Sequence, residues 1–129
     1  MSFWKVAVKP GKPFALGTWD GKFLFGLPGN PVSAFVTFLL LVRPALLKLQ
    51  GAKHLELPAR PGLLEEAIVN DGDRRHFIRV TLDLHGQVRS AGPQASHLLR
   101  SLAQANGLVD VPPKTTLPSG ARVAVLCWE

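Results

Sequence analysis

Near the start of the chain, apolar residues form two short runs, at residues 14–19 and at residues 22–26. Asp20-Gly21 separates them, and this pair is typical of a two-residue β-hairpin turn. The sequence therefore predicts two antiparallel strands. The second is aromatic and apolar over residues 22–25, and we expect it to be buried.

Residues 32–49 are apolar almost without interruption, over a length typical of a helix. A helix that is apolar on most sides is buried on most sides, so its cover must come from further chain or from a second copy. The most apolar part of this helix ends at Arg43-Pro44, and we expect that part to be too short to span a bilayer. Pro44 is expected to bend the helix or start a new turn. Gly51 is expected to end it. The less apolar positions fall on one stripe: Ser33, Thr37, Pro44 and Lys48.

The corner between strand and helix, residues 26–31, has the sequence Gly-Leu-Pro-Gly-Asn-Pro. Asn30 is a favourable N-cap, and Pro31 falls at the first helical position, where its missing N–H is not needed. Glycine lets the backbone approach a ligand closely, and open amides at a helix start suit an anion. Two interpretations stay open here, a capped structural turn and an anion site.

Residues 4–9 alternate as a strand does, with Lys5 and Lys9 on one face and only Ala7 between them. The two ammonium groups would lie roughly 13 Å apart along the strand. This leaves room for an anionic ligand, although from this segment alone an exposed edge with two solvated lysines is the simpler explanation. Residues 10–13 break the strand and do not form a phosphate-binding loop of the Walker type.

The pattern changes at residues 50–54, because short strand-like runs then alternate with turn residues. We therefore predict an α/β segment over residues 1–50 and a small, mostly β segment, clip-like or barrel-like, over residues 54–129. The second segment is expected to contain a polar turn at 69–73, strands at 76–84, 87–89, 108–111 and 122–128, and a short helix at 96–105. In the strand at 76–84 one face should carry Ile78, Val80, Leu82 and Leu84, and the other Phe77, Arg79, Thr81 and Asp83.

The composition of the chain excludes several kinds of site and function. Cys127 is the single cysteine, so an internal disulfide is excluded, a core or rim thiol is expected, and a reducing cytoplasm fits. No secretory signal pattern is present at the start. The four histidines lack paired metal spacing, so no metal site is expected from these residues.

The formal net charge is +6, but aromatic residues do not interleave with the basic ones, which disfavours nucleic acid as a partner. A basic cluster, Arg74, Arg75 and Arg79, is either a solvated face or a binding patch.

Two stretches together carry a resemblance. The first is Lys-Val-Ala-Val-Lys-Pro-Gly-Lys-Pro-Phe at residues 5–14, followed by Gly-Leu-Pro-Gly-Asn-Pro-Val-Ser-Ala at residues 26–34. The second combines Ser96-x-x-Leu99, the run at residues 102–108 and a final Gly-x-x-Val at 120–123. Together they resemble the C-terminal part of the MoeA/gephyrin-type molybdopterin molybdenumtransferases, over nearly the whole chain.

The resemblance implies the end of a MogA/MoaB-like α/β domain in residues 1–50 and a C-terminal β domain in 54–129. It implies insertion of molybdate into adenylylated molybdopterin with release of AMP, assisted by Mg²⁺, in a homodimer that meets other proteins of this pathway. No nucleic acid or membrane partner is implied. The family's functional lysines fall on Lys5 and Lys9, and its functional prolines on Pro28 and Pro31. Neighbouring residues are included as binding candidates: Lys12, Gly29, Asn30 and Ser33.

The family's catalytic carboxylates would lie upstream of residue 1, and nothing in this sequence replaces them. We therefore expect the isolated chain not to transfer molybdenum. The alternative function is a non-catalytic interaction or dimerisation module of the same pathway.

Overall fold

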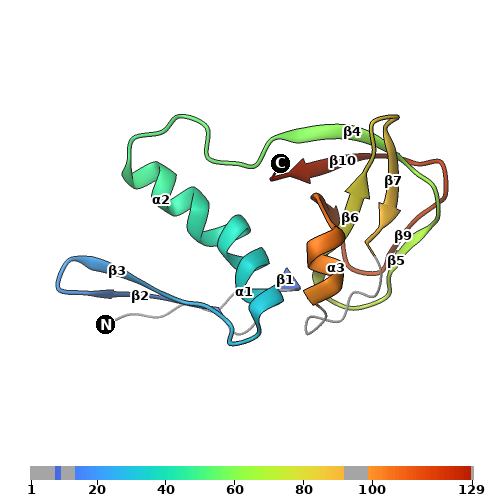
Figure 1. Cartoon of the computed structure of the whole chain (residues 1–129). Coiled ribbons are helices and arrows are strands. Elements are labelled where there is room, and N and C mark those ends of the chain that lie inside the picture. The colour runs from blue at the N-terminus through green and yellow to red at the C-terminus, as the bar shows by residue number, and fades with distance from the viewer. Residues whose placement is uncertain (1–7, 10–13, 92–98, 129) are drawn as a thin grey trace.

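A computed structural model describes the backbone of residues 8–9, 14–91 and 99–128 and the side chains of 14–91 and 102–128. A β-hairpin and a long helix lie on one side of the molecule, and a small β-barrel with a short helix lies on the other (Figure 1). The elements in the first half are β1 (Val8–Lys9), β2 (Ala15–Trp19), β3 (Lys22–Gly26), α1 (Pro31–Thr37), η1 (Phe38–Val42) and α2 (Arg43–Leu49). Those in the second half are β4 (Ala59–Leu64), β5 (Ile68–Asn70), β6 (Arg75–Leu82), β7 (Gln87–Ser90), α3 (Leu99–Gln104), β8 (Gly107–Val111), β9 (Thr115–Leu117) and β10 (Arg122–Cys127).

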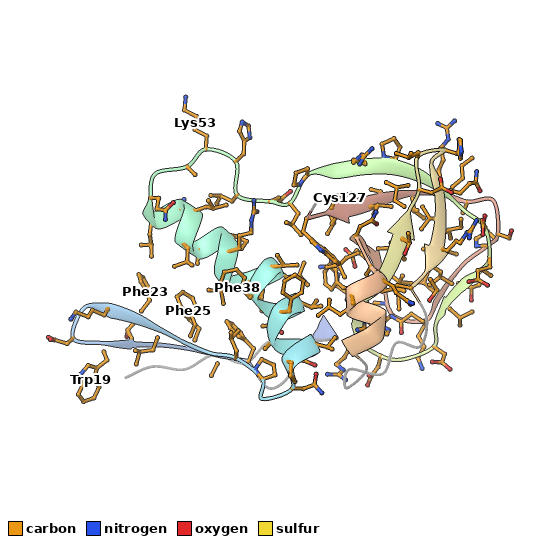
Figure 2. All side chains as sticks on the ribbon, viewed as in Figure 1. Trp19, Phe23, Phe25, Phe38, Lys53 and Cys127 are labelled. Carbon is orange, nitrogen blue, oxygen red and sulfur yellow. The ribbon has the colours of Figure 1, made fainter. Side chains whose placement is uncertain are left out.

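The hairpin of β2 and β3 confirms the predicted antiparallel pair, with Trp19 opposite Lys22. Asp20 and Gly21 both have positive φ, 51° and 72°, as this tight turn requires. The predicted burial of β3 is wrong, however, because Lys22, Phe23 and Leu24 are exposed and Phe23 retains 53% of its accessible surface. Phe23 and Phe25 line a cavity together with Leu49 of α2, and Trp19 points away from the helix on the other face of the hairpin (Figure 2).

The predicted helix is continuous from Pro31 to Leu49 but changes pitch in the middle. Five residues of π-helix, η1, precede Pro44, and the amide of Arg43 donates to the carbonyl of Phe38, five residues back. A proline ring clashes with the carbonyl four residues before it, and the wider turn relieves this contact. At the other end Gly51 has φ 81°, and its amide and that of Ala52 donate to the carbonyls of Lys48 and Leu47. This confirms Gly51 as the glycine that ends the helix.

The helix is less buried than the sequence suggests. Val32, Val36 and Thr37 are inaccessible, whereas α2 buries no residue fully and Leu49 is 61% exposed. The described helix has 19 residues with a mean hydropathy of 1.8, enough to cross a membrane by length and composition alone. The length limit that we applied to the most apolar part, before Arg43, therefore does not hold for the whole helix. The same properties mark a core helix, and Val36 packs here against the barrel residues Phe77 and Leu108.

The second half forms a closed barrel, because the strand order β6-β7-β4-β10-β8 returns to β6 through a β6–β8 pairing. Its interior is apolar and includes Ile78, Val80, Val88, Val109 and Val125. β5 and β9 form a separate two-stranded ribbon, and β1 extends the barrel sheet by pairing in parallel with β6. The fold therefore matches the predicted order of α/β elements followed by a mostly β unit.

Local differences have clear physical causes. β6 ends at Leu82, so Leu84 lies in the following turn and is 98% exposed rather than on the apolar face. The opposite face of β6 is also buried at Phe77 and Arg79, because helices form a second layer over the barrel. Residues 69 and 70 belong to strand β5 and not to a turn, and the predicted helix at 96–105 is described over Leu99–Gln104. The strands predicted near 108–111 and 122–128 are confirmed as β8 and β10. Cys127 is a free thiol buried inside the barrel.

Candidate functional site

The corner at residues 26–31 joins β3 to α1 and is held by one side chain. The Oδ1 atom of Asn30 accepts hydrogen bonds from the amides of Val32 at 3.0 Å and Ser33 at 3.2 Å. Asn30 has extended backbone dihedrals and Pro31 begins the helix, as the sequence predicts. This geometry confirms Asn30 as an N-cap.

The first-turn amides of α1 are therefore not open. Those of Val32 and Ser33 bind the Asn30 side chain, the amide of Ala34 donates to the Asn30 carbonyl at 2.8 Å, and Pro31 has no N–H. The expectation of free helix amides for an anion is wrong, because the cap that the sequence predicts already satisfies them. What α1 can still offer an anion is the positive end of its dipole.

The predicted binding residues of the corner differ in accessibility. Pro28 and Ser33 are buried, Asn30 is half-buried, and Gly29 and Pro31 are exposed. A Cβ atom added to Gly29 would meet nothing within 4 Å, so the space over this backbone is open. A ligand could therefore approach the corner at Gly29 and Pro31 but would not reach the Ser33 side chain without rearrangement.

The predicted lysines are only partly covered by the structure. Lys9 lies in β1, paired with His76 of β6 in a parallel register. Lys5 and Lys12 lie outside the described residues. The structure thus brings the backbone of Lys9 to the barrel sheet, and the convergence of the lysines with the corner stays a prediction.

Sequence reasoning missed Thr37, one turn after Ser33 on the helix. Its side chain is inaccessible, and its Oγ1 atom has no hydrogen-bond partner. Thr37 directly precedes the π-helical turn, a local irregularity that often marks functional positions. The sequence signal was the small polar stripe through an otherwise apolar helix, which we recognised without assigning it a role.

The interpretation of the basic cluster as a solvated face was wrong for Arg79, whereas Arg75 is exposed. Arg79 is 1% exposed, and burial lowers the pKa of its guanidinium. Arg75 is exposed and forms a bidentate ion pair with Asp110, whose hydrogen bond raises the pKa of Arg75. Two of the three arginines are thus structural, since they lie on β6 at the layer between barrel and helices.

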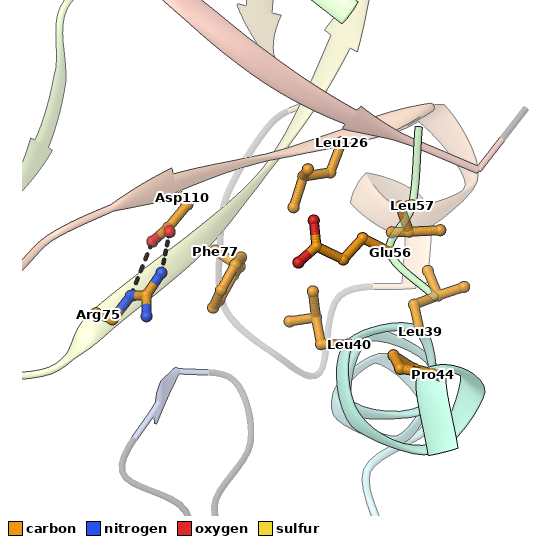
Figure 3. Close-up of a pocket in the computed structure, with 9 residues that line it drawn as sticks. All are labelled: Leu39, Leu40, Pro44, Glu56, Leu57, Arg75, Phe77, Asp110 and Leu126. Carbon is orange, nitrogen blue, oxygen red and sulfur yellow. Dashed lines mark hydrogen bonds and ion pairs between the residues drawn. The ribbon is translucent and has the colours of Figure 1, made fainter. Parts of the chain in front are cut away.

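A cavity of about 270 Å³ lies where the long helix meets the barrel (Figure 3). Its walls are mostly apolar, and the Glu56 carboxylate points into it between Leu126 and Leu40. The Arg75–Asp110 pair closes one side. The lining residues are Leu39, Leu40, Pro44, Glu56, Leu57, Arg75, Phe77, Asp110 and Leu126, and of these the sequence analysis had considered only Arg75, as part of the basic cluster.

No group of three or more potential metal ligands occurs among the histidine, cysteine and acidic side chains that the structure describes. These side chains therefore do not fit a magnesium site.

Comparison with protein families places both halves of the chain. Residues 61–128 match the MoeA C-terminal region (domain IV), and residues 1–48 match a probable molybdopterin binding domain. The first match alone covers more than half of the chain. The chain belongs to the MoeA family. The resemblance predicted from the lysine and Leu-Pro-Gly-Asn-Pro motifs is confirmed.

Individual MoeA relatives agree in sequence and in fold. The chain is 40% identical over 111 residues to the molybdopterin molybdenumtransferase of Haemophilus influenzae, covering 82% of this chain and 28% of that protein. It is 43% identical over 113 residues to molybdopterin molybdenumtransferase 2 of Mycobacterium tuberculosis, covering 87% of this chain and 28% of that protein. The crystal structure of a molybdopterin biosynthesis MoeA protein from Pyrococcus horikoshii superimposes with a TM-score of 0.82 at 31% identity, covering 97% of this chain and 31% of that one. The chain thus spans about 28% of the length of the curated relatives named here.

Proposed function

We propose that this chain acts in molybdenum cofactor biosynthesis, as the C-terminal portion of an enzyme that inserts molybdate into adenylylated molybdopterin and releases AMP. The observation that carries the proposal is the 40–43% identity to two molybdopterin molybdenumtransferases over more than four-fifths of the chain. Residues 1–50 would form the end of the molybdopterin-binding domain and residues 54–129 the C-terminal β domain. The family matches at 1–48 and 61–128 support this division.

Lys5 and Lys9 would supply the positive charge that binds the pterin phosphate or molybdate, since an ammonium is a compact point charge for such anions. Lys12 would assist them. Pro28, Gly29, Asn30 and Pro31 would form a rigid floor, and the helix dipole behind Pro31 would add positive potential. Ser33 would support this floor from its buried position.

The enzyme would work as a cytoplasmic homodimer with Mg²⁺. The ligands for Mg²⁺ would come from carboxylates outside this sequence, because the described side chains contain no suitable cluster. The isolated chain should therefore bind molybdopterin without turning it over.

Equilibrium binding of molybdopterin to the purified chain tests the site. We expect the double variant Lys5→Ala/Lys9→Ala to bind at least about tenfold more weakly, the loss typical of charge-assisted contacts to an anion. Lys53→Ala is the matched control, because Lys53 is exposed in the segment between helix and barrel. Equal binding by the double variant and the control would refute the lysine site and favour a non-catalytic interaction module.

Release of AMP from adenylylated molybdopterin by the unmodified chain tests the missing carboxylates. No turnover is expected, with or without added Mg²⁺ and molybdate. Turnover by the 129-residue chain would show that the catalytic groups lie within it.

A further inference from the structure

The cavity between the long helix and the barrel combines apolar walls with a net negative charge. Three of its lining residues are charged, Glu56, Arg75 and Asp110, and the others are apolar. Arg75 forms an ion pair with Asp110, and its Cζ atom lies 5.6 Å from the centroid of the Phe77 ring. Arg75 and Asp110 neutralise each other, so the Glu56 carboxylate sets the charge of the cavity. The formal net charge of the whole chain is +6, of the opposite sign.

The Glu56 carboxylate points into this cavity between Leu40 and Leu126 (Figure 3). The ion pairs found among the described side chains do not use Glu56. The guanidinium of Arg75 also lines the cavity, but it already donates two hydrogen bonds to Asp110. Glu56 as a residue is exposed, so the cavity opens to solvent beside it. A cation that enters can therefore pair with Glu56 without displacing another described side chain.

The volume of the cavity, about 270 Å³, limits the size of an occupant. An apolar cavity of about 150 Å³ holds one benzene molecule, so this cavity has room for a ring with a short chain, about ten non-hydrogen atoms. Small-molecule sites in proteins range from about 300 to 1,000 Å³, so the cavity is near the lower end of that range. It fits a small molecule and has no room for a peptide segment of several residues.

Both halves of the chain contribute walls. The long helix supplies Leu39, Leu40 and Pro44, the segment after it supplies Glu56 and Leu57, and strands β6, β8 and β10 supply the rest. An occupant would thus contact three parts of the fold at once. A molecule that binds the folded chain and not the unfolded one raises the free energy of unfolding. Occupancy should therefore raise the midpoint of thermal unfolding.

We propose that this cavity binds a small organic amine. Its ammonium group pairs with the Glu56 carboxylate, and its apolar body packs against the leucines of the helix and of β10. An ammonium has three N–H donors, and hydrogen bonds from a cation to a carboxylate are among the strong ones. This inference does not depend on the proposed function, because none of the residues proposed to bind molybdopterin lines the cavity.

A second cavity of about 270 Å³, between the hairpin and α2, provides an internal comparison. Its lining is apolar except for Lys48, so the charged residue there is a cation. An apolar molecule of the right size fits either cavity. A positive charge on that molecule should favour the cavity with Glu56, and a negative charge should favour the cavity with Lys48.

Isothermal titration of the purified chain with phenethylamine, a ring with a short ammonium chain, tests the proposal. We expect a Kd of about 1 mM or tighter for a ligand of this size. Phenethyl alcohol and hydrocinnamate have similar shapes but lack the positive charge, so both should bind at least about tenfold more weakly. Amine binding that does not saturate, or equal binding of the alcohol, would overturn the proposal.

Substitution of Glu56 tests the ion pair. Glu56→Gln keeps the length of the side chain and should weaken phenethylamine binding at least about tenfold. Glu66→Gln, at an exposed position outside the cavity, is the matched control and should bind as the wild type does. Glu56→Lys should bind hydrocinnamate more tightly than phenethylamine, and circular dichroism should show an unchanged fold because Glu56 is exposed. Equal amine binding by Glu56→Gln and Glu66→Gln would overturn the proposal.

Methyl NMR locates the bound amine. The resonances of Leu39, Leu40 and Leu126 should shift during the titration with the Kd measured by calorimetry. Those of Leu16 and Leu49, which line the hairpin cavity, should stay in place. Shifts confined to Leu16 and Leu49, or no methyl shifts at all, would place the amine outside the cavity with Glu56 and overturn the proposal.

Discussion

The Oδ1 atom of Asn30 lies 3.0 Å from the amide nitrogen of Val32 and accepts its hydrogen bond, and the same oxygen also accepts a hydrogen bond from the amide of Ser33. One side chain thereby fixes the start of the long helix at the corner proposed to hold the cofactor precursor. Substitutions of Asn30 can separate the stability of the fold from ligand binding at this corner. The cap requires only a hydrogen-bond acceptor in the side chain, whereas the binding of an anion also depends on the charge of that side chain.

Asn30→Ala should lower the free energy of unfolding by about 1–2 kcal/mol, since the cap is lost. Asn30→Asp keeps the acceptor and should leave stability nearly unchanged, but its negative charge should weaken molybdopterin binding. Urea denaturation and equilibrium binding measure the two effects. Unchanged binding by Asn30→Asp would show that the corner does not face the anion.

Gly62→Ala and Gly29→Ala should behave oppositely. A Cβ atom at Gly62 would lie 2.4 Å from Cγ2 of Val88 in the barrel core, so we expect a loss of about 1–3 kcal/mol from overpacking. At Gly29 the same methyl group meets nothing within 4 Å, so stability should be retained while a ligand over the corner is obstructed. Thermal unfolding distinguishes them, and Gly62→Ala/Val88→Ala should recover part of the loss.

Thr37→Val should be neutral or stabilise the fold by up to about 1 kcal/mol. It replaces a buried hydroxyl that lacks a partner with a methyl group of similar size. Thr37→Ser keeps the hydroxyl and removes a buried methyl, so it should destabilise by about 1 kcal/mol. Chemical denaturation of both variants is the measurement. Strong destabilisation by Thr37→Val would mean that the hydroxyl has a hydrogen-bond partner in solution.

Asn70 should be among the most sensitive polar residues of the β unit. Its buried amide donates to the carbonyls of Arg74, Val111 and Pro112, and its oxygen accepts from Gly72. Asn70→Ala should lower stability by about 2–3 kcal/mol, because buried backbone groups lose their partners. Asp71→Ala, at the exposed neighbouring position, is the control and should have little effect on the urea midpoint.

The Asp83 carboxylate should make the free energy of unfolding decrease as the pH falls into the acid range. The amide of Gln87 donates to it, and so does that of His85, which lowers its pKa in the folded state. A lowered folded pKa adds stability above the unfolded value of about 3.9, and this contribution disappears as pH falls through the folded pKa. Between pH 7 and pH 3 the wild type should therefore lose more stability than Asp83→Asn, by a small margin since Asp83 is at the surface. Equal pH profiles in urea denaturation would contradict this.

Local chemistry made much of the fold predictable. Asp20-Gly21, Asn30-Pro31 and Gly51 act through their own backbone preferences, so the hairpin and both ends of the helix follow from neighbours in sequence. The family likewise followed from two short motifs. The burial of individual side chains was less predictable, because it depends on which elements pack together. Phe23 is exposed although it is aromatic, and Arg79 is buried although it is charged.

The order of elements, the capped corner and the family follow from the chain's residues alone, because each depends on residues within a few positions of one another. The pairing of β6 with β8 that closes the barrel, and the burial of the Thr37 hydroxyl without a partner, were not predictable in this way. These features arise from contacts between segments far apart in the chain, and the free energy of such contacts depends on what covers each face.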